Sequence, residues 1–135
     1  MTPGRLAQPT AASSEHVEKP WGHEEIFAAV EGSYVLKTLT VSAGQALSLQ
    51  WHQEKDETIA VLSGLVEMDL GPSADDLHTL SVRPGESVHV APRLLHRVRA
   101  LTDAVLVEAS NALPGWRRDI VRLQDDYGRT GTREP

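Results

Sequence analysis

Residues 44–64, which read GQALSLQWHQEKDETIAVLSG, decide the fold and the candidate site that we predict for this chain. The segment begins and ends at glycine, and its first half alternates so that Gln50 and His52 share one face of an extended strand. Glu57 opens a second strand-like run, which a hairpin would return beside the first. One imidazole, one carboxylate and one amide oxygen would then converge as donors for a divalent metal. Taken alone, the same residues fit a polar, solvated hairpin equally well.

The second informative segment is residues 83–96, which read RPGESVHVAPRLLH. Pro92 ends one extended run, and His96 begins the next with its ring directed into the predicted barrel. If the hairpins at 46–62 and 87–100 face each other, this histidine supplies the missing ligand. We therefore predict one metal site formed by Gln50, His52, Glu57 and His96.

The composition limits the classes of function. With 135 residues the chain suits one domain, and without cysteine it has neither a disulfide framework nor thiol chemistry. The formal charge of −6 argues against nucleic acid and anionic membranes as partners. The longest apolar stretches are five or six residues, too short for a transmembrane helix or a signal sequence. We therefore expect a cytoplasmic protein.

Short extended runs between residues 24 and 109 carry the fold prediction. Turn signals separate eight or nine such runs, and helical periodicity is not sustained. This pattern predicts an all-β fold, best described as a double-sheet jelly-roll barrel. Residues 71–76 are expected to form the main internal loop, and residues 119–123 either a final strand or a helical turn. The predicted boundaries are an N-terminal tail or arm at 1–16, one domain at 17–127 and a C-terminal tail at 128–135.

Together the two segments resemble the two motifs of the cupin superfamily, whose fold is a double-stranded β-helix. The first motif is carried by Gly44, Gln50, His52, Glu57 and Gly64, and the second by Gly85, Glu86, Pro92 and His96. Flanking segments, among them KPWG at 19–22 and DIVR at 119–122, narrow the resemblance to the cupin domain of type II mannose-6-phosphate isomerases. The resemblance covers roughly residues 17–129.

The resemblance implies a metal-dependent enzyme that interconverts mannose 6-phosphate and fructose 6-phosphate, with the sugar phosphate as its small-molecule partner. It also implies one divalent ion, with zinc favoured and manganese, iron, cobalt or nickel as alternatives, and a homodimer, as in cupins generally. Two other functions stay open. One is another metal-dependent cupin enzyme, such as a dioxygenase or a different sugar isomerase or epimerase. The other is a non-catalytic cupin that binds a metal or a sugar.

Three basic residues are candidates for contact with the substrate. Lys37 faces the predicted interior, where an unpaired ammonium is costly. It either serves in catalysis, through a substrate oxygen or a proton transfer, or forms an ion pair with Glu57, Glu67 or Glu108. Arg122 and Arg129 lie in the segment that resembles the isomerases, and guanidinium groups match phosphate well. The remaining histidines have no partner at ligand spacing, and we interpret each as surface or structural: His16, His23, His78 and His89.

The chain departs from the isomerase pattern in three places. Residues 55–59, KDETI, stand where the family usually has Arg-x-Glu-His-Trp, and Ala100 stands where it usually has asparagine. Residues 108–111, EASN, are what remains of a Glu-Val-Gln-x-Gly segment. The four ligand positions survive these departures. We therefore expect the metal site to be kept and part of the substrate-contacting surface to be altered.

Overall fold

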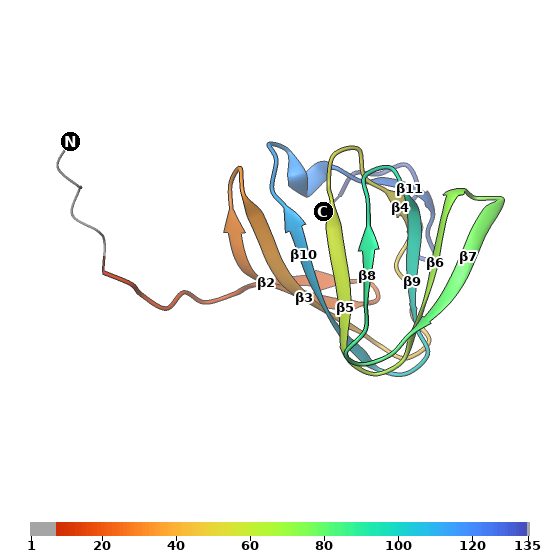
Figure 1. Cartoon of the computed structure of the whole chain (residues 1–135), viewed down its shortest axis with the longest axis horizontal. Coiled ribbons are helices and arrows are strands. Elements are labelled where there is room, and N and C mark those ends of the chain that lie inside the picture. Colours follow the sequence, from red (N-terminus) through yellow and green to blue (C-terminus); the bar gives the residue numbers. More distant parts are fainter. Residues whose placement is uncertain (1–7, 135) are drawn as a thin grey trace.

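The computed structural model describes residues 8–134, which form two antiparallel β-sheets packed face to face (Figure 1). The larger sheet has the strand order β1 (Glu15–Lys19), β2 (Gly22–Val30), β3 (Tyr34–Val41), β10 (Ala104–Asn111), β5 (Glu57–Ser63) and β8 (Ser87–Val90). The smaller sheet has the order β11 (Val121–Gln124), β4 (Leu49–Trp51), β9 (Leu95–Ala100), β6 (Val66–Ser73) and β7 (Asp76–Val82). The predicted all-β jelly roll is confirmed.

Alternate residues of both sheets fill the space between them. Leu39, Val61 and Leu106 from the larger sheet and Met68 and Val98 from the smaller one are almost completely buried in a single cluster. Successive side chains of a strand point to opposite faces, so the apolar residues that alternate along each strand all point into the space between the sheets. The apolar contacts of this cluster hold the two sheets together.

Two strand pairings position the candidate site. β4 pairs with β9 so that Gln50 lies opposite His96, and β5 pairs with β8 so that Glu57 lies opposite Val90. Gly64, which closes the first sequence motif, has a positive φ of 85°, and a Cβ there would lie 2.2 Å from a backbone carbonyl oxygen. Glycine is therefore required where the chain leaves β5 and crosses to the other sheet.

The prediction of an internal loop at residues 71–76 is wrong. β6 continues through Ser73 and β7 already starts at Asp76, so the turn is only two residues long. A register shift between Leu70 and Ser73 accommodates Gly71 and Pro72 within the strand. Gly71 approaches the Asp76 carbonyl so closely that a Cβ would lie 1.8 Å from its oxygen, which explains a glycine inside a strand.

The two ends of the chain differ from the predicted tails. β1 begins at Glu15, two residues before the expected domain start, because residues 15–19 pair along their whole length with β2. Residues 8–14 precede β1 without strand or helix, and residues 1–7 and 135 of the predicted tails lie outside the described residues. At the C-terminal end, residues 128–134 fold back on the domain, where the Gly131 N–H donates to the Arg122 carbonyl at 3.3 Å.

Residues 119–123 were expected to form either a strand or a helical turn, and the structure contains a strand there. β11 spans Val121–Gln124, and two residues separate it from the short 3-10 helix Trp116–Arg118. Within residues 8–134, no helix is long and apolar enough to cross a membrane.

Candidate metal centre

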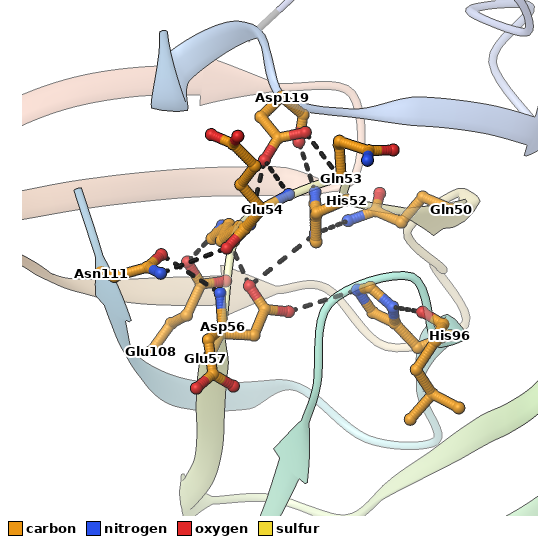
Figure 2. Close-up of polar contacts among 12 residues, drawn as sticks. Gln50, His52, Gln53, Glu54, Asp56, Glu57, His96, Glu108, Asn111 and Asp119 are labelled. Atoms are coloured by element: carbon orange, nitrogen blue, oxygen red, sulfur yellow. Dashed lines mark hydrogen bonds and ion pairs between the residues drawn. The ribbon is translucent and has the colours of Figure 1, made fainter. Parts of the chain in front are cut away.

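The structure brings the four predicted ligands close together (Figure 2). Gln50 lies on β4 and His96 on β9, the strand paired with it. His52 follows the last residue of β4, and Glu57 is the first residue of β5. The strand predicted for residues 46–52 is thus shorter than expected, but the alternation still directs Gln50 and His52 toward the same point.

The Glu57 carboxylate lies between two imidazoles. Its Oε1 is 3.2 Å from His96 Nε2, and its Oε2 is 3.8 Å from His52 Nε2. One donor atom from each of these three residues lies within 4.8 Å of the other two, and all three residues are buried. Two imidazoles and a carboxylate form a donor set suited to a borderline divalent metal.

Backbone carbonyls orient both rings. His52 Nδ1 donates to the carbonyl oxygen of Asp119 at 2.6 Å, and His96 Nδ1 donates to that of Leu94 at 2.9 Å. Because a neutral imidazole carries one proton, each Nε2 is left with its lone pair directed at the cluster. Histidines that bind metals are oriented by such contacts at the other nitrogen.

The ionisation of the cluster also suits a cation. Burial and then the nearby Lys55 ammonium lower the pKa of His52 to about 4, so the ring is neutral at neutral pH. Burial alone would raise the pKa of Glu57, but the nearby charges, chiefly the Lys55 ammonium, more than offset it and hold that pKa well below its usual value. His96 Nε2 is buried without a hydrogen bond among the described residues. An ion between the three residues would satisfy it.

Gln50 does not present its oxygen to the cluster in this conformation. Its Oε1 accepts a hydrogen bond from Ser48 Oγ at 2.6 Å, and its Nε2 lies 3.4 Å from His52 Nε2. The Ser48 hydroxyl can also accept a hydrogen bond, so it would equally hold the amide after a half turn. Gln50 therefore reaches the cluster, and its oxygen faces the cluster only in the turned orientation.

A cavity of about 240 Å³ adjoins the cluster. Gln50 and His52 line it on one side, and Trp21, Leu39 and Leu47 give it an apolar wall. Partly apolar walls with a few polar groups are typical of sites that bind small organic ligands.

A chain of alternating charges runs from the cavity wall to the cluster. Its contacts join Lys19 to Glu24 at 3.5 Å, Glu24 to Lys37 at 2.7 Å, Lys37 to Glu108 at 3.4 Å, Glu108 to Lys55 at 2.8 Å, and Lys55 to Glu57 at 3.0 Å. Lys55 is buried, which contradicts the interpretation of residues 54–57 as a solvated turn. The ion pairs with Glu57 and Glu108 explain its burial, because a buried charge requires a partner.

Comparison with known proteins identifies the family of the chain. The family model described as "mannose-6-phosphate isomerase C-terminal" matches residues 7–125. The chain belongs to this family. It is 28% identical over 124 residues to the alginate biosynthesis protein AlgA of Pseudomonas putida. The aligned region covers 89% of this chain and 24% of that protein. It is 29% identical over 116 residues to the xanthan biosynthesis protein XanB of Xanthomonas campestris, covering 84% of this chain and 24% of that protein.

The chain thus spans about a quarter of the length of these curated relatives. Among solved structures, CapF in complex with 3-isopropenyl-tropolone superposes with a TM-score of 0.72 at 20% identity, over 82% of this chain and 34% of that one. This likeness concerns the fold alone. The predicted resemblance to cupins and to the isomerase family is confirmed.

In this family member, the three basic candidates all line the cavity, and each has a partner. Lys37 forms ion pairs with Glu108, one of the expected partners, and with Glu24, which the sequence did not suggest. Arg129 forms two hydrogen bonds to the Asp125 carboxylate, each 2.9 Å long.

Arg122 is held differently. It is buried, and its guanidinium donates to the carbonyl oxygens of Thr132 and Glu134 and to the Thr132 hydroxyl, at 2.6–3.4 Å. Its Nε has no hydrogen-bond partner among the described residues. The residues that contact it belong to the segment expected to be a C-terminal tail. Arg122 also lies opposite Gln50 in the β11–β4 pairing, which places it close to the candidate ligands.

Of the positions that depart from the isomerase pattern, Thr58, Ile59 and Ala100 do not line the cavity, whereas Lys55 does. Ile59 and Ala100 are buried in the apolar core, and Thr58 is exposed on the outer face of β5. A strand position alternates between core and surface, so neighbouring Thr58 and Ile59 point away from each other. Thr58, Ile59 and Ala100 therefore do not contribute side chains to the cavity surface.

Asp119 and Asn111 are residues of the site that sequence reasoning missed. The Asp119 carboxylate accepts hydrogen bonds from the N–H groups of Gln53, Glu54 and Lys55 at 2.7–3.0 Å, while its carbonyl holds His52. The Asn111 amide donates to the Glu54 carbonyl and accepts from the Asp56 N–H, both at 3.1 Å. These two side chains fix the loop between β4 and β5 that carries the ligands. The DIVR segment, which starts at Asp119, indicated the family resemblance but not that Asp119 holds this loop.

Proposed function

We propose that this protein is a metal-dependent isomerase that interconverts mannose 6-phosphate and fructose 6-phosphate. The observation that carries the proposal is the convergence of His52 Nε2, His96 Nε2 and the Glu57 carboxylate beside a cavity, in a chain of the mannose-6-phosphate isomerase C-terminal family. These three residues would hold the ion, with Gln50 as a fourth ligand after its amide turns. Zinc is the favoured ion, and a homodimer stays a prediction.

The reaction moves a proton between adjacent carbons of the sugar, and the proposal assigns parts of it to named residues. A bound divalent ion would supply Lewis-acid stabilisation of the negative charge that develops on the substrate oxygens. Lys37 lines the cavity and is proposed to contact a substrate oxygen and to take part in proton transfer. The apolar wall of Trp21, Leu39 and Leu47 would exclude water from the reacting atoms.

Arg122 is the proposed phosphate contact. The other cations that line the cavity each have a carboxylate partner, namely Lys19, Lys37, Lys55, Arg117 and Arg129. In the described part of the chain, Arg122 makes hydrogen bonds only to neutral oxygens and keeps an unpartnered Nε. A phosphate could replace those neutral acceptors and gain a charge-assisted contact. Arg129 would contribute only if it leaves Asp125.

The direct test is turnover by the metal-loaded protein. We expect mannose 6-phosphate to be converted to fructose 6-phosphate in a coupled assay, and a chelator to abolish the activity reversibly. His89→Ala is the matched control and should keep full activity, because His89 is exposed and pairs with exposed Asp56. If the buried cluster of each chain holds one ion and no turnover is observed, the proposed isomerase activity is contradicted. It would favour a cupin that acts on another substrate or only binds its ligand.

Lys37→Met should lower kcat by about 10²–10⁴-fold, the range that a positioned proton-transfer group contributes. The substitution leaves both buried carboxylates paired, because Glu24 keeps Lys19 and Glu108 keeps Lys55. Metal content and thermal stability should therefore change little. Lys19→Met removes a cation from the same cavity and the same network, and we expect it to change kcat by less than about 10-fold. Equal losses in the two variants would refute a specific role for Lys37.

A further inference from the structure

A second cluster of metal-binding side chains lies on the hairpin of β1 and β2. In this pairing His16 lies opposite Glu25 and Glu18 lies opposite His23, so all four side chains project from the same face. The opposite face carries Val17, Lys19, Glu24 and Ile26, which line the cavity of the candidate metal centre. The cluster is thus on the outer surface of a cavity wall, separate from the buried cluster.

The side chains of this hairpin cluster approach one another closely. One donor atom from each of His16, His23 and Glu25 lies within 4.8 Å of the other two. The rings of His16 and His23 stack with their centroids 4.9 Å apart. His16 Nε2 lies 2.5 Å from a Glu18 oxygen, and His16 Nδ1 contacts a Glu25 oxygen. The spacing in sequence suggested no partner for either histidine, and the strand pairing supplies both.

Both ring nitrogens of His16 face carboxylate oxygens, which has a chemical consequence. A neutral imidazole carries one N–H, so it can donate to only one of the two carboxylates. The other nitrogen then points a lone pair at a negatively charged oxygen. A cation is needed to make that arrangement favourable, and it can be either a second proton on the ring or a metal ion bound between the nitrogen and the carboxylate.

We propose that His16, His23 and Glu25 form a second binding site for a borderline divalent metal such as Zn²⁺, with Glu18 accepting a hydrogen bond from the other nitrogen of His16. Two imidazoles and a carboxylate match the ligands that Zn²⁺ takes in proteins. In the described part of the chain, β1 is an edge strand that pairs only with β2, so an ion shared between the two strands would tie β1 to the sheet. Because metal binding to the folded state is linked to folding, Zn²⁺ should also stabilise this hairpin.

The role of His23 distinguishes a metal site from a cluster of ion pairs. The carboxylates raise the pKa of His16, so a protonated His16 held between Glu18 and Glu25 is the competing interpretation. That ion-pair cluster needs His16 but not His23, whose contact with His16 is ring stacking. A metal site needs both rings. Removal of His23 therefore has different consequences under the two interpretations.

The test is the number of Zn²⁺ ions that the full chain binds in a calorimetric titration with zinc chloride. Wild-type protein should bind one more ion than His23→Ala and one more than His16→Ala. His78→Ala, which removes an exposed histidine elsewhere, should bind as many as the wild type. Circular dichroism would show that each variant remains folded, and Mg²⁺ should give no binding at the cluster because it prefers oxygen ligands.

The same titration on the double variant His52→Ala, His96→Ala separates this proposal from the proposed function. One Zn²⁺ per chain should remain, bound to the hairpin, and it should be lost when His23→Ala is added. Equal zinc stoichiometry and affinity in the wild type and in His23→Ala would overturn the hairpin site, whatever the buried cluster does. If only the double variant fails to fold, the comparison of wild type with His23→Ala still decides.

Discussion

His52→Ala and His96→Ala are each expected to lower the affinity of the buried cluster for its metal by more than about 100-fold, since loss of merely an outer hydrogen-bond partner costs about 10–100-fold. Each substitution deletes one of the two imidazoles whose Nε2 faces Glu57, and within residues 8–134 the cluster contains no third histidine. Isomerase activity should disappear together with the ion. Inductively coupled plasma mass spectrometry on dialysed protein would measure the metal content.

This measurement is best made with His16→Ala in every protein, so that only the buried cluster contributes to the metal content. His89→Ala in the same background is the control and should keep the ion, because His89 is exposed and pairs with Asp56. Full metal content in both ligand variants would mean that the ion binds elsewhere. The residues 50–57 would then be the polar hairpin that their sequence also allows.

Lys55→Met is expected to lower the free energy of unfolding by about 3–5 kcal/mol at pH 7, the usual cost of removing one partner of a buried ion pair. Lys55 Nζ is the ammonium that contacts Glu57 Oε2 at 3.0 Å and Glu108 Oε2 at 2.8 Å. Without it, Glu57 retains only the neighbouring imidazoles, and Glu108 retains the longer contact to Lys37. Urea denaturation in the presence of a chelator would measure the loss without compensation by a bound ion.

The loss of stability in Lys55→Met should also depend on pH, in a direction that the pKa of Glu57 determines. In the wild type the pKa of Glu57 is held low, so its carboxylate stabilises the fold above its unfolded pKa of about 4.3, and this contribution is lost as the pH falls through the folded value. In Lys55→Met, burial without the ammonium should raise that pKa. The stability difference between the two proteins should therefore shrink as the pH falls from 7 toward 4.

Lys19→Met provides the matched control for Lys55→Met. The Lys19 side chain is also buried, but its partner Glu24 keeps the shorter contact with Lys37 after the substitution. We expect a clearly smaller loss of stability. If the two variants lose the same stability, or if the loss in Lys55→Met does not change with pH, the buried ion pairs of Lys55 are not what stabilises this region.

The sequence predicted those parts of the site that depend on local alternation. Gln50 and His52 are two residues apart, and the turn to Glu57 is short, so strand geometry alone brings them together. His96 could be added because a double-sheet fold places its hairpin opposite the first. The same reasoning predicted the two sheets, since a period of two dominates the residues between 24 and 109.

The parts that could not be predicted depend on contacts between distant segments. Lys55 looked like a member of a charged turn, and its burial depends on Glu108, which arrives on β10. Asp119 caps the ligand loop from 64–66 residues away, and no local pattern indicates such a contact. The segment over Arg122 looked like a tail because its residues are polar and aperiodic. Backbone carbonyls of this segment accept the hydrogen bonds of Arg122, and because every residue has a carbonyl, the sequence does not indicate such a contact.

The most direct test of the metal centre is a crystal structure of the zinc-loaded protein with data collected on both sides of the zinc absorption edge. We predict an anomalous peak among His52 Nε2, His96 Nε2 and the Glu57 carboxylate, with the Gln50 amide turned so that its oxygen faces the peak. The peak should be absent from crystals of His96→Ala. Zinc-loaded crystals without a peak at this position, while the three side chains keep the arrangement described above, would contradict the metal centre and the isomerase that depends on it.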